Sequence, residues 1–451
     1  MPSKPRFLCM EKDDLVWQKL DEATNEWDIS IRTKETYRAV ANLILKYKEG
    51  QTELMHPAVK GGYNVVYRLE YKDGSSAIMR IPIRVRYEVA TMRYVAANTT
   101  IPVPHVYYYG TAADNPIGLG RRAADQHPIL NPDVSEEELE FLYSQIANIL
   151  LQLSSLKFPR IGSLVEKEDG ISTSVEGRPL TMNMSDLIVH TNTPASILPS
   201  QTYASADEWY KALADMHIIQ LAFQRNDAVE DEGDARVKYR RLASELESDG
   251  GFTLFSEDFR PANILLDKDL RIVSVIDWEF AYAAPTQFSF DPPWWLLLEE
   301  PGSWTGGYHA WMEVYEPRLR TFLRALEAEE KKMTAANIAE KVGRMSLAGG
   351  GKTEVPLSQR MRESWEKRTW MRNYAARKSW AFDFVWWKFL DESYPRPNEN
   401  QDYHARLELL SGSQRELMEA FVACKMEESR NPGIIEWEDK RAADRLAELL
   451  V

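Results

Sequence analysis

The stretch LFSEDFRPANILLDKDLRIVSVIDWE, residues 254–279, decides how this chain is interpreted. Asp258 and Asn263 stand five positions apart in a loop that contains proline. Two β-rich runs follow, joined by the polar turn 267–269, and this pattern predicts a hairpin. Because the second strand of a hairpin returns toward the start of the first, we expect Asp277 to approach Asn263.

The residue types at these three positions indicate phosphoryl transfer. The carboxamide of Asn263 and the carboxylate of Asp277 offer oxygen ligands that suit Mg²⁺, an ion that also binds water and phosphate oxygens. The carboxylate of Asp258, free in the loop, is placed to orient a hydroxyl group and accept its proton. The alternative is structural, with turn chemistry at Asp258 and Asn263 and a strand-end cap at Asp277.

The rest of the chain changes character near residue 134. Two β-rich runs flank an Asp-Gly turn at residues 72–74, which predicts a second hairpin, and a helix is expected from Glu88 to Ala97. From Ser135 onward helical periodicity dominates, beginning with the capping-box spacing Ser135 to Glu138. We therefore expect a small β-rich lobe followed by a large helical one.

Composition excludes several classes of protein. The chain has 451 residues, 44% of them apolar, which is too much core material for a disordered protein. Its net charge of −14 argues against a nucleic-acid binder, whose affinity needs clustered cations. Two cysteines cannot form a disulfide framework, and no apolar run is long enough to span a bilayer. We expect a cytoplasmic protein with no membrane partner; oligomeric state is not readable from the sequence.

The motif D-x-x-x-x-N at 258–263, followed by I-D-W-E at 276–279, resembles the catalytic loop and metal-binding aspartate of the aminoglycoside phosphotransferase and choline kinase superfamily. The chain looks most like the large fungal branch of phosphotransferase-enzyme-family proteins. Supporting segments are QRNDA at 224–228, DPPWW at 291–295 and IPVP at 101–104.

The resemblance implies a bilobal, protein-kinase-like α+β fold and a set of roles in the large lobe. Asp258 would be the catalytic base, and Asn263 and Asp277 would be the Mg²⁺ ligands. Glu279 would either assist the metal or be a solvated or arginine-paired carboxylate. ATP and Mg²⁺ are the cofactors that this family pattern implies.

In the small lobe the resemblance implies a phosphate-binding set. Gly61 and Gly62 would form the loop over the phosphates, where glycine lets backbone amides approach oxygen closely. Arg80 stands at the position of the phosphate-holding strand residue, and Glu88 is its candidate ion-pair partner. The alternatives are a plain hairpin turn for the glycines and a surface arginine at a strand end.

The expected domain organisation follows from these motifs. We expect an N-terminal helical extension over 1–54, a nucleotide-binding small lobe over 55–115, a degenerate hinge over 116–134 and a large catalytic lobe over 135–451, with a flexible insertion at 331–356. Asp291, followed by proline, is typical of a helix N-cap. The aromatic residues between Trp365 and Phe389 are expected to pack between helices rather than to line an acceptor pocket.

The leading hypothesis is an ATP-dependent phosphotransferase that acts on a hydroxyl group of a small molecule, for which a cationic acceptor would suit the acidic chain. The rival is a catalytically inactive pseudokinase that serves as a binding or interaction module. The sequence of residues 119–127 supports the pseudokinase hypothesis, because it lacks the β-rich run that would lead into an adenine-binding hinge. A protein kinase is a weaker third hypothesis, since no activation-loop signature is present.

Overall fold

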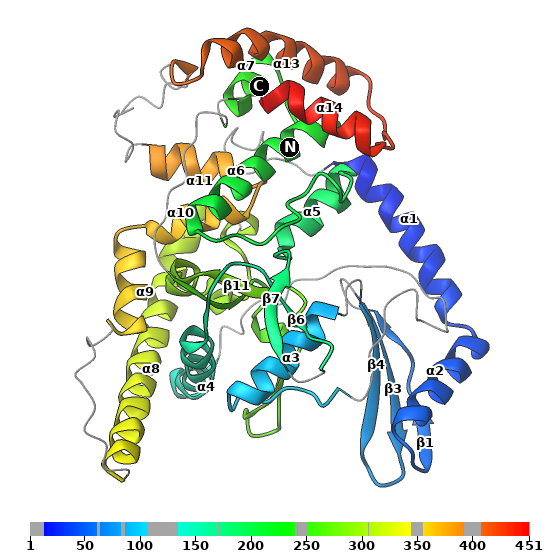
Figure 1. The fold of residues 1–451 in the computed structure, drawn as a ribbon, viewed down its shortest axis with the longest axis vertical. Helices are drawn as coiled ribbons and strands as arrows, with labels where there is room; N and C mark the ends of the chain where they lie inside the picture. The colour runs from blue at the N-terminus through cyan, green and yellow to red at the C-terminus, as the bar shows by residue number, and fades with distance from the viewer. Residues whose placement is uncertain are drawn as a thin grey trace.

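The computed structural model has a small lobe built on a sheet and a large lobe built mostly of helices (Figure 1). It describes residues 13–60, 64–82, 86–106, 134–169, 172–239, 241, 251–304, 306–343, 355–391 and 407–450. This architecture is the bilobal α+β fold that the sequence predicts. Within these residues, no helix is both long and apolar enough to pass through a membrane.

The sheet of the small lobe has four antiparallel strands with β3 at its centre. The strands are β1 (Thr52–Met55), β2 (Val59–Lys60), β3 (Asn64–Tyr71) and β4 (Ser76–Pro82). β1 and β2 pair with opposite ends of β3, whereas β4 pairs along its whole length. The turn between β3 and β4 is the predicted one: Gly74 has φ of 80°, a region that favours glycine. The hairpin is confirmed, and it carries Arg80 on β4.

Helix α2 (Lys34–Tyr47) belongs to this lobe, because it packs on β3 and β4. Its buried side chains join strand residues in a core that is separate from that of the large lobe: Val40, Ile44, Val65, Tyr67 and Leu69. Part of the segment that we expected to be an N-terminal extension is therefore integral to the small lobe.

Helix α3 (Arg86–Asn98) follows the sheet in sequence but packs on the large lobe. Its buried Ala90, Met92 and Val95 belong to the large-lobe core, and the helix lies against strand β6 (Ser163–Glu166). Strand β6 pairs with β7 (Thr173–Gly177). We had placed this helix in the small lobe. In consequence, Glu88 on α3 and Arg80 on β4 stand on opposite sides of the lobe boundary.

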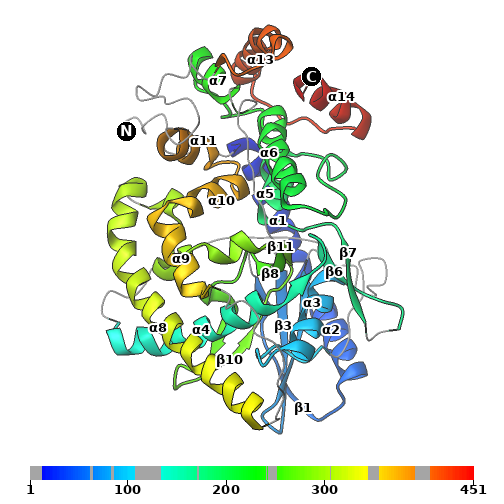
Figure 2. The same cartoon turned by 60° about the vertical axis from the view of Figure 1, so that its left-hand side comes forward.

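The large lobe is a set of helices around one continuous core. They are α4 (Glu136–Ser155), α5 (Met182–Thr191), α6 (Ala206–Phe223), α7 (Glu232–Tyr239), α8 (Gly307–Gly343), α9 (Leu357–Glu366), α10 (Thr369–Arg377), α11 (Phe382–Val385), α13 (Gly412–Arg430) and α14 (Asp439–Leu450). Figure 2 shows α4 crossing α8 and α9 beside it, and both contact α8. The predicted capping box opens α4, with the Glu138 amide donating to Ser135 Oγ at 3.2 Å.

Two predictions about the C-terminal half have different outcomes. The aromatic residues do pack between helices, since Trp370, Tyr374, Phe382 and Phe384 are buried in the large-lobe core. The flexible insertion, by contrast, does not begin at residue 331, because residues 331–343 continue α8. The remainder of that segment up to residue 354 lies outside the described residues.

Short strands place residues 258–263, the predicted catalytic-loop segment, on the large lobe. A three-stranded sheet contains β5 (Lys157–Phe158), β8 (Phe252–Ser256) and β11 (Ala281–Pro285), and a separate hairpin contains β9 (Ile264–Leu266) and β10 (Ile272–Val275). β8 lies in the middle and pairs antiparallel with both neighbours. The loop that follows β8 is thus fixed at its base by two strands.

Helix α1 (Asp14–Ile31) runs from the large lobe to the small lobe (Figure 1). At its start the buried Asp13 accepts hydrogen bonds from the Asn226 backbone amide at 3.1 Å and from Asn226 Nδ2 at 2.8 Å. The Gly433 amide in turn donates to Asn226 Oδ1 at 2.9 Å. At its end Ile31 is buried in the small-lobe core. α1 is therefore attached to both lobes.

Replacing Asn226 by alanine should release the start of α1. The Asp13 carboxylate would keep the backbone amides of residue 226 and Val16 but lose the Asn226 Nδ2 donor, and a hydrogen bond to a buried charged group contributes up to about 3 kcal/mol. Because each 1.4 kcal/mol is about a tenfold change in an equilibrium constant, the amides of α1 should exchange with deuterium about a hundredfold faster. Hydrogen exchange read by mass spectrometry measures this. The matched control is Glu26→Ala, an exposed position of the same helix, and unchanged exchange in Asn226→Ala would contradict the assignment.

Candidate active site

The loop after β8 holds Asp258 and Asn263 against each other. A short 3-10 helix, η2 (Pro261–Asn263), turns the chain so that Asn263 Nδ2 donates to the Asp258 backbone carbonyl at 2.8 Å and to Asp258 Oδ2 at 2.9 Å. Both side chains are buried. Because the side-chain nitrogen Nδ2 is used in this way, the side-chain oxygen Oδ1 of Asn263 remains as the atom that could bind a cation.

The predicted hairpin forms and returns the chain to Asn263. Strands β9 and β10 pair with each other, and Val275 lies opposite Ile264. The Ile276 amide donates to the backbone carbonyl of Asn263 at 2.9 Å. The next residue, Asp277, has φ of 65°, a left-handed conformation in which aspartate is enriched among the non-glycine residues. This backbone reversal breaks the strand at Asp277, directly beside the catalytic-loop segment.

Arg80 joins the two lobes at this point. Its Nη2 lies 2.6 Å from Asp277 Oδ1, and its Nη1 forms an ion pair with Glu88 Oε1. The three side chains are largely buried, with 20%, 16% and 7% exposed for Arg80, Asp277 and Glu88. The ion pair expected between Arg80 and Glu88 is present, and Asp277 makes it a triad.

Burial shifts the titration of the carboxyl groups around Arg80. It raises the pKa of Asp258 to about 6, with the nearby Asp277 adding to the rise and Arg260 opposing it. It also raises the pKa of Glu88 to about 7, although the adjacent Arg80 guanidinium acts in the opposite direction. Glu279 is buried, and desolvation together with the Asp277 charge holds its pKa well above its usual range. Burial therefore holds these carboxyl groups toward their neutral forms.

The predicted metal ligands have a donor set that fits Mg²⁺. Asn263 and Asp277 offer only oxygen atoms, and Mg²⁺ usually takes one or two protein ligands and completes its shell with water and phosphate. In the described part of the chain, no three side chains of His, Cys, Asp or Glu converge as a metal cage. Glu279 Oε2 is buried and makes no hydrogen bond to any described residue, and it is not part of such a cage. A two-ligand site shared with phosphate remains the prediction.

Some predicted elements lie outside the described residues. Gly61 and Gly62 are among them, as are residues 116–133 of the predicted hinge 116–134. Their predicted roles over the phosphates and at the adenine therefore stay predictions. One assignment was wrong: Asp291 is not a helix N-cap but a buried carboxylate that accepts from Asn373 Nδ2 at 2.7 Å and from Arg377 Nη2 at 2.5 Å.

Sequence reasoning missed two residues of the loop. Glu257 stands where the superfamily usually has glycine, and its carboxylate accepts from the Met182 amide at the start of α5 at 2.7 Å and from the Tyr282 hydroxyl at 3.1 Å. Nothing local in the sequence signals these distant partners. Arg260 forms an ion pair with Asp258, with 2.8 Å between Nε and Oδ1. Its position two residues after the candidate base is a signal that could have found it.

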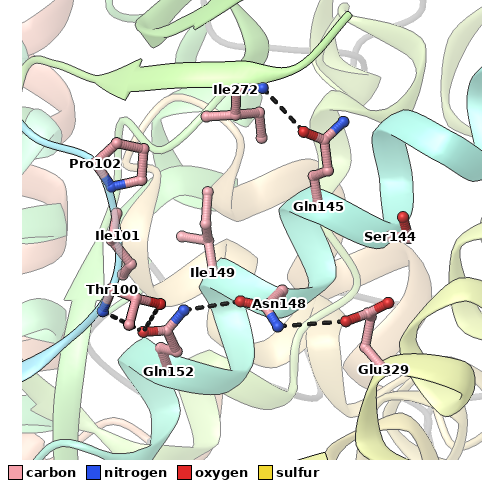
Figure 3. Close-up of a pocket in the computed structure, with 10 residues that line it drawn as sticks. All are labelled: Thr100, Ile101, Pro102, Ser144, Gln145, Asn148, Ile149, Gln152, Ile272 and Glu329. Atoms are coloured by element: carbon pink, nitrogen blue, oxygen red, sulfur yellow. Dashed lines mark hydrogen bonds between the residues drawn. The ribbon is translucent and has the colours of Figure 1, made fainter. Parts of the chain in front are cut away.

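A cavity of about 250 Å³ lies behind the hairpin, between α4 and the segment after α3 (Figure 3). Gln145 on α4 reaches the hairpin, accepting from the Ile272 amide and donating to the Leu270 carbonyl, each at 2.9 Å. Further hydrogen bonds run along the wall, from Gln152 to Asn148 and from Asn148 to Glu329. These polar groups satisfy one another, so the cavity wall serves to hold the hairpin that ends at Asp277.

Comparison with known proteins gives one family match and several structural likenesses. The model of the family described as "Phosphotransferase enzyme family" matches residues 56–327, which is more than half of the chain. Solved structures that resemble the chain include a thermostable mutant of an aminoglycoside phosphotransferase with AMP-PNP and hygromycin B, at a TM-score of 0.37 and 16% identity, covering 72% of this chain and 97% of that one. Macrolide 2'-phosphotransferase type I has a TM-score of 0.37 at 14% identity, covering 84% and 98%.

Curated relatives match over shorter stretches. A subtelomeric hrmA-associated cluster protein of Aspergillus fumigatus is 31% identical over 123 residues, covering 24% of this chain and 24% of that protein. Altered inheritance of mitochondria protein 9 of Yarrowia lipolytica is 26% identical over 277 residues, covering 49% and 48%. The chain thus spans between about a quarter and a half of the length of these relatives.

The raised pKa of Glu88 predicts a pH-dependent stability. A carboxyl group whose pKa is higher in the folded state stabilises the fold fully below its unfolded value of 4.5, and this contribution is lost as pH rises toward 7. Glu88→Gln cannot titrate. Its melting temperature relative to wild type should therefore rise between pH 4.5 and 8, by the equivalent of about 3 kcal/mol at most.

The matched control for this measurement is Glu137→Gln, an exposed carboxylate on α4. Its melting temperature relative to wild type should stay constant over the same pH range. A Glu88→Gln difference that does not depend on pH would show that the pKa of Glu88 is not raised by folding, which contradicts the prediction.

Proposed function

Because the chain belongs to the phosphotransferase enzyme family, we propose that it is an ATP-dependent phosphotransferase that transfers a phosphoryl group to a hydroxyl of a small molecule. The observation that carries the proposal is that Asp258 is hydrogen-bonded to Asn263 and lies close enough to Asp277, the partner of Arg80, to interact with it electrostatically. This set combines a buried base, two oxygen ligands and a cation, which are the parts that phosphoryl transfer needs.

The residues divide the work by position. Asn263 and Asp277 would hold Mg²⁺, which when bound supplies positive charge against the phosphates. Arg80 would steady the phosphate chain from the small lobe, because its guanidinium already spans Glu88 and Asp277. Asp258 would orient the acceptor hydroxyl and take its proton. Gly61 and Gly62 would cover the phosphates with backbone amides.

The acceptor is proposed only by chemical class. The described site contains the carboxyl groups Glu88, Asp258, Asp277 and Glu279 against the guanidinium groups of Arg80 and Arg260. Because the raised pKa values hold Glu88 and Glu279 toward their neutral forms, these groups are close to charge balance, and it is the net charge of −14 of the whole chain that favours a neutral or cationic acceptor over an anionic one. A cytoplasmic location stays part of the proposal, as does action without a nucleic-acid or membrane partner.

The second candidate is a pseudokinase that binds a partner without transferring phosphate. The sequence of residues 119–127 favours it, because that stretch lacks the β-rich run expected of an adenine-binding hinge. The two candidates differ in whether Mg·ATP binds at all, so nucleotide binding separates them.

Mg·ATP should raise the melting temperature of the protein. A ligand that binds only the folded state stabilises it by about 2.7 kcal/mol at a hundredfold excess over its Kd. Asp277→Asn is the matched control, because asparagine also tolerates the left-handed backbone at this position but lacks the charge. The shift should need Mg²⁺ and should be lost in the variant. No shift at millimolar Mg·ATP would favour the pseudokinase.

Phosphoryl transfer should depend on Asp258 and on pH. With a folded pKa of about 6, Asp258 is ionised above pH 6, so the rate should level off there and fall about tenfold per pH unit below it. Asp258→Asn should lower the rate by at least about a hundredfold while Mg·ATP still binds. The measurement is radiolabelled phosphate transfer from ATP to a panel of small-molecule alcohols. An unchanged rate in the variant would remove Asp258 from the role of base.

A further inference from the structure

Arg260 occupies a fixed position at the base of the catalytic-loop segment. It precedes Pro261 and has the extended backbone that proline imposes on its predecessor, with φ of −151° and ψ of 163°. Its carbonyl accepts from the Asn263 amide at 2.9 Å, so Arg260 and the predicted metal ligand share one short turn. The side chain therefore starts from a backbone that the loop itself holds in place.

The guanidinium of Arg260 is only partly used by its ion pair. Its Nε lies 2.8 Å from Asp258 Oδ1, an ion pair without hydrogen-bond geometry, and among the described residues Asp258 is its sole acidic partner within ion-pair distance. A guanidinium carries five N–H donors in a planar fork, so contact through one edge leaves donors for a second anion. The Arg260 side chain is 30% exposed whereas that of Asp258 is 6% exposed, so the arginine reaches solvent where the carboxylate does not.

The charges around Asp258 indicate that this second anion is the transferred phosphoryl group. Arg80 reaches the cluster from the small lobe and is already engaged by both Glu88 and Asp277. A phosphoryl group in transfer carries negative charge on its three equatorial oxygens and must pass next to the base, among several carboxylates. Arg260 is the cation that stands at the base itself.

We propose that Arg260 is a further catalytic residue, which donates hydrogen bonds to the transferred phosphoryl group while its Nε edge keeps Asp258 aimed at the acceptor. The acceptor oxygen forms a bond to the γ-phosphorus, and the bond from that phosphorus to the bridging oxygen breaks, leaving its electron pair on ADP. The acceptor proton passes to Asp258. Arg260 remains protonated throughout. The inference rests on the proposed function, since it needs ATP in the site.

A purely structural role is the alternative, in which Arg260 only neutralises the buried Asp258. The two roles differ in what happens when a planar phosphoryl mimic is present. The structural role predicts equal loss of affinity for every nucleotide state, or no loss. The catalytic role predicts a loss confined to the state that imitates transfer, because Arg260 meets the moving group and not ADP.

The test compares Mg·ADP with Mg·ADP plus aluminium fluoride, measured by isothermal titration calorimetry on the full chain. In the wild type, aluminium fluoride should tighten ADP binding at least tenfold. Arg260→Gln should bind Mg·ADP within about twofold of wild type and lose that enhancement. Arg260→Lys, which keeps the charge but not the fork, should retain part of it. The matched control is Arg320→Gln, which removes an exposed arginine paired with Glu316 at 2.8 Å and should behave as wild type.

The other possible results of this titration each contradict the proposed role of Arg260. Full enhancement in Arg260→Gln overturns the inference, as does a wild type that binds Mg·ADP but gains nothing from aluminium fluoride. A wild type that does not bind Mg·ADP removes the proposed function as well, which distinguishes that failure from the other two. Where circular dichroism shows that Arg260→Gln does not fold, Arg260→Lys carries the test, and an enhancement equal to that of wild type in Arg260→Lys then overturns the role of the fork.

Discussion

The ion pairs of Arg80 are the interaction on which the site depends, because they join parts of the molecule that otherwise belong to different cores. Arg80 lies on β4 of the small lobe, whereas Glu88 and Asp277 belong to elements packed on the large lobe. With Glu279 nearby, three carboxyl groups share one guanidinium in a largely buried setting. Without that cation, carboxylates at these positions would repel one another at close range in a medium of low dielectric constant.

The parts of the structure that sequence could predict are those specified locally. The hairpin that carries Asp277 follows from two β-rich runs and a polar turn, and the α4 capping box follows from the spacing of Ser135 and Glu138. The packing of α3 on the large lobe and the pairing of Asp291 with Arg377 could not be predicted. Their partners are distant in sequence, and neither periodicity nor spacing encodes which distant surface a helix or carboxylate will meet.

The catalytic-loop segment shows how one chain accommodates a departure from its family's usual residues. A glycine before the base would leave the loop to be held by other contacts. Here Glu257 binds the exposed amide at the start of α5 instead, a favourable position for a carboxylate because of the helix dipole. The loop thus receives anchors on both sides of Asp258, from Glu257 toward α5 and from Arg260 toward η2. A substitution that looks like a loss in the motif is, in the fold, a different way of fixing the same loop.

The attachment of α1 at both of its ends restricts how the lobes can move. The small-lobe sheet lies in sequence between α1, whose start is bound to Asn226, and α3, which packs on the large lobe. A rigid body pinned at two separate places can turn only about the line that joins the two pins. Opening and closing of the molecule is thereby reduced to rocking about a single axis, and the ion pair between Arg80 and Asp277 resists that motion.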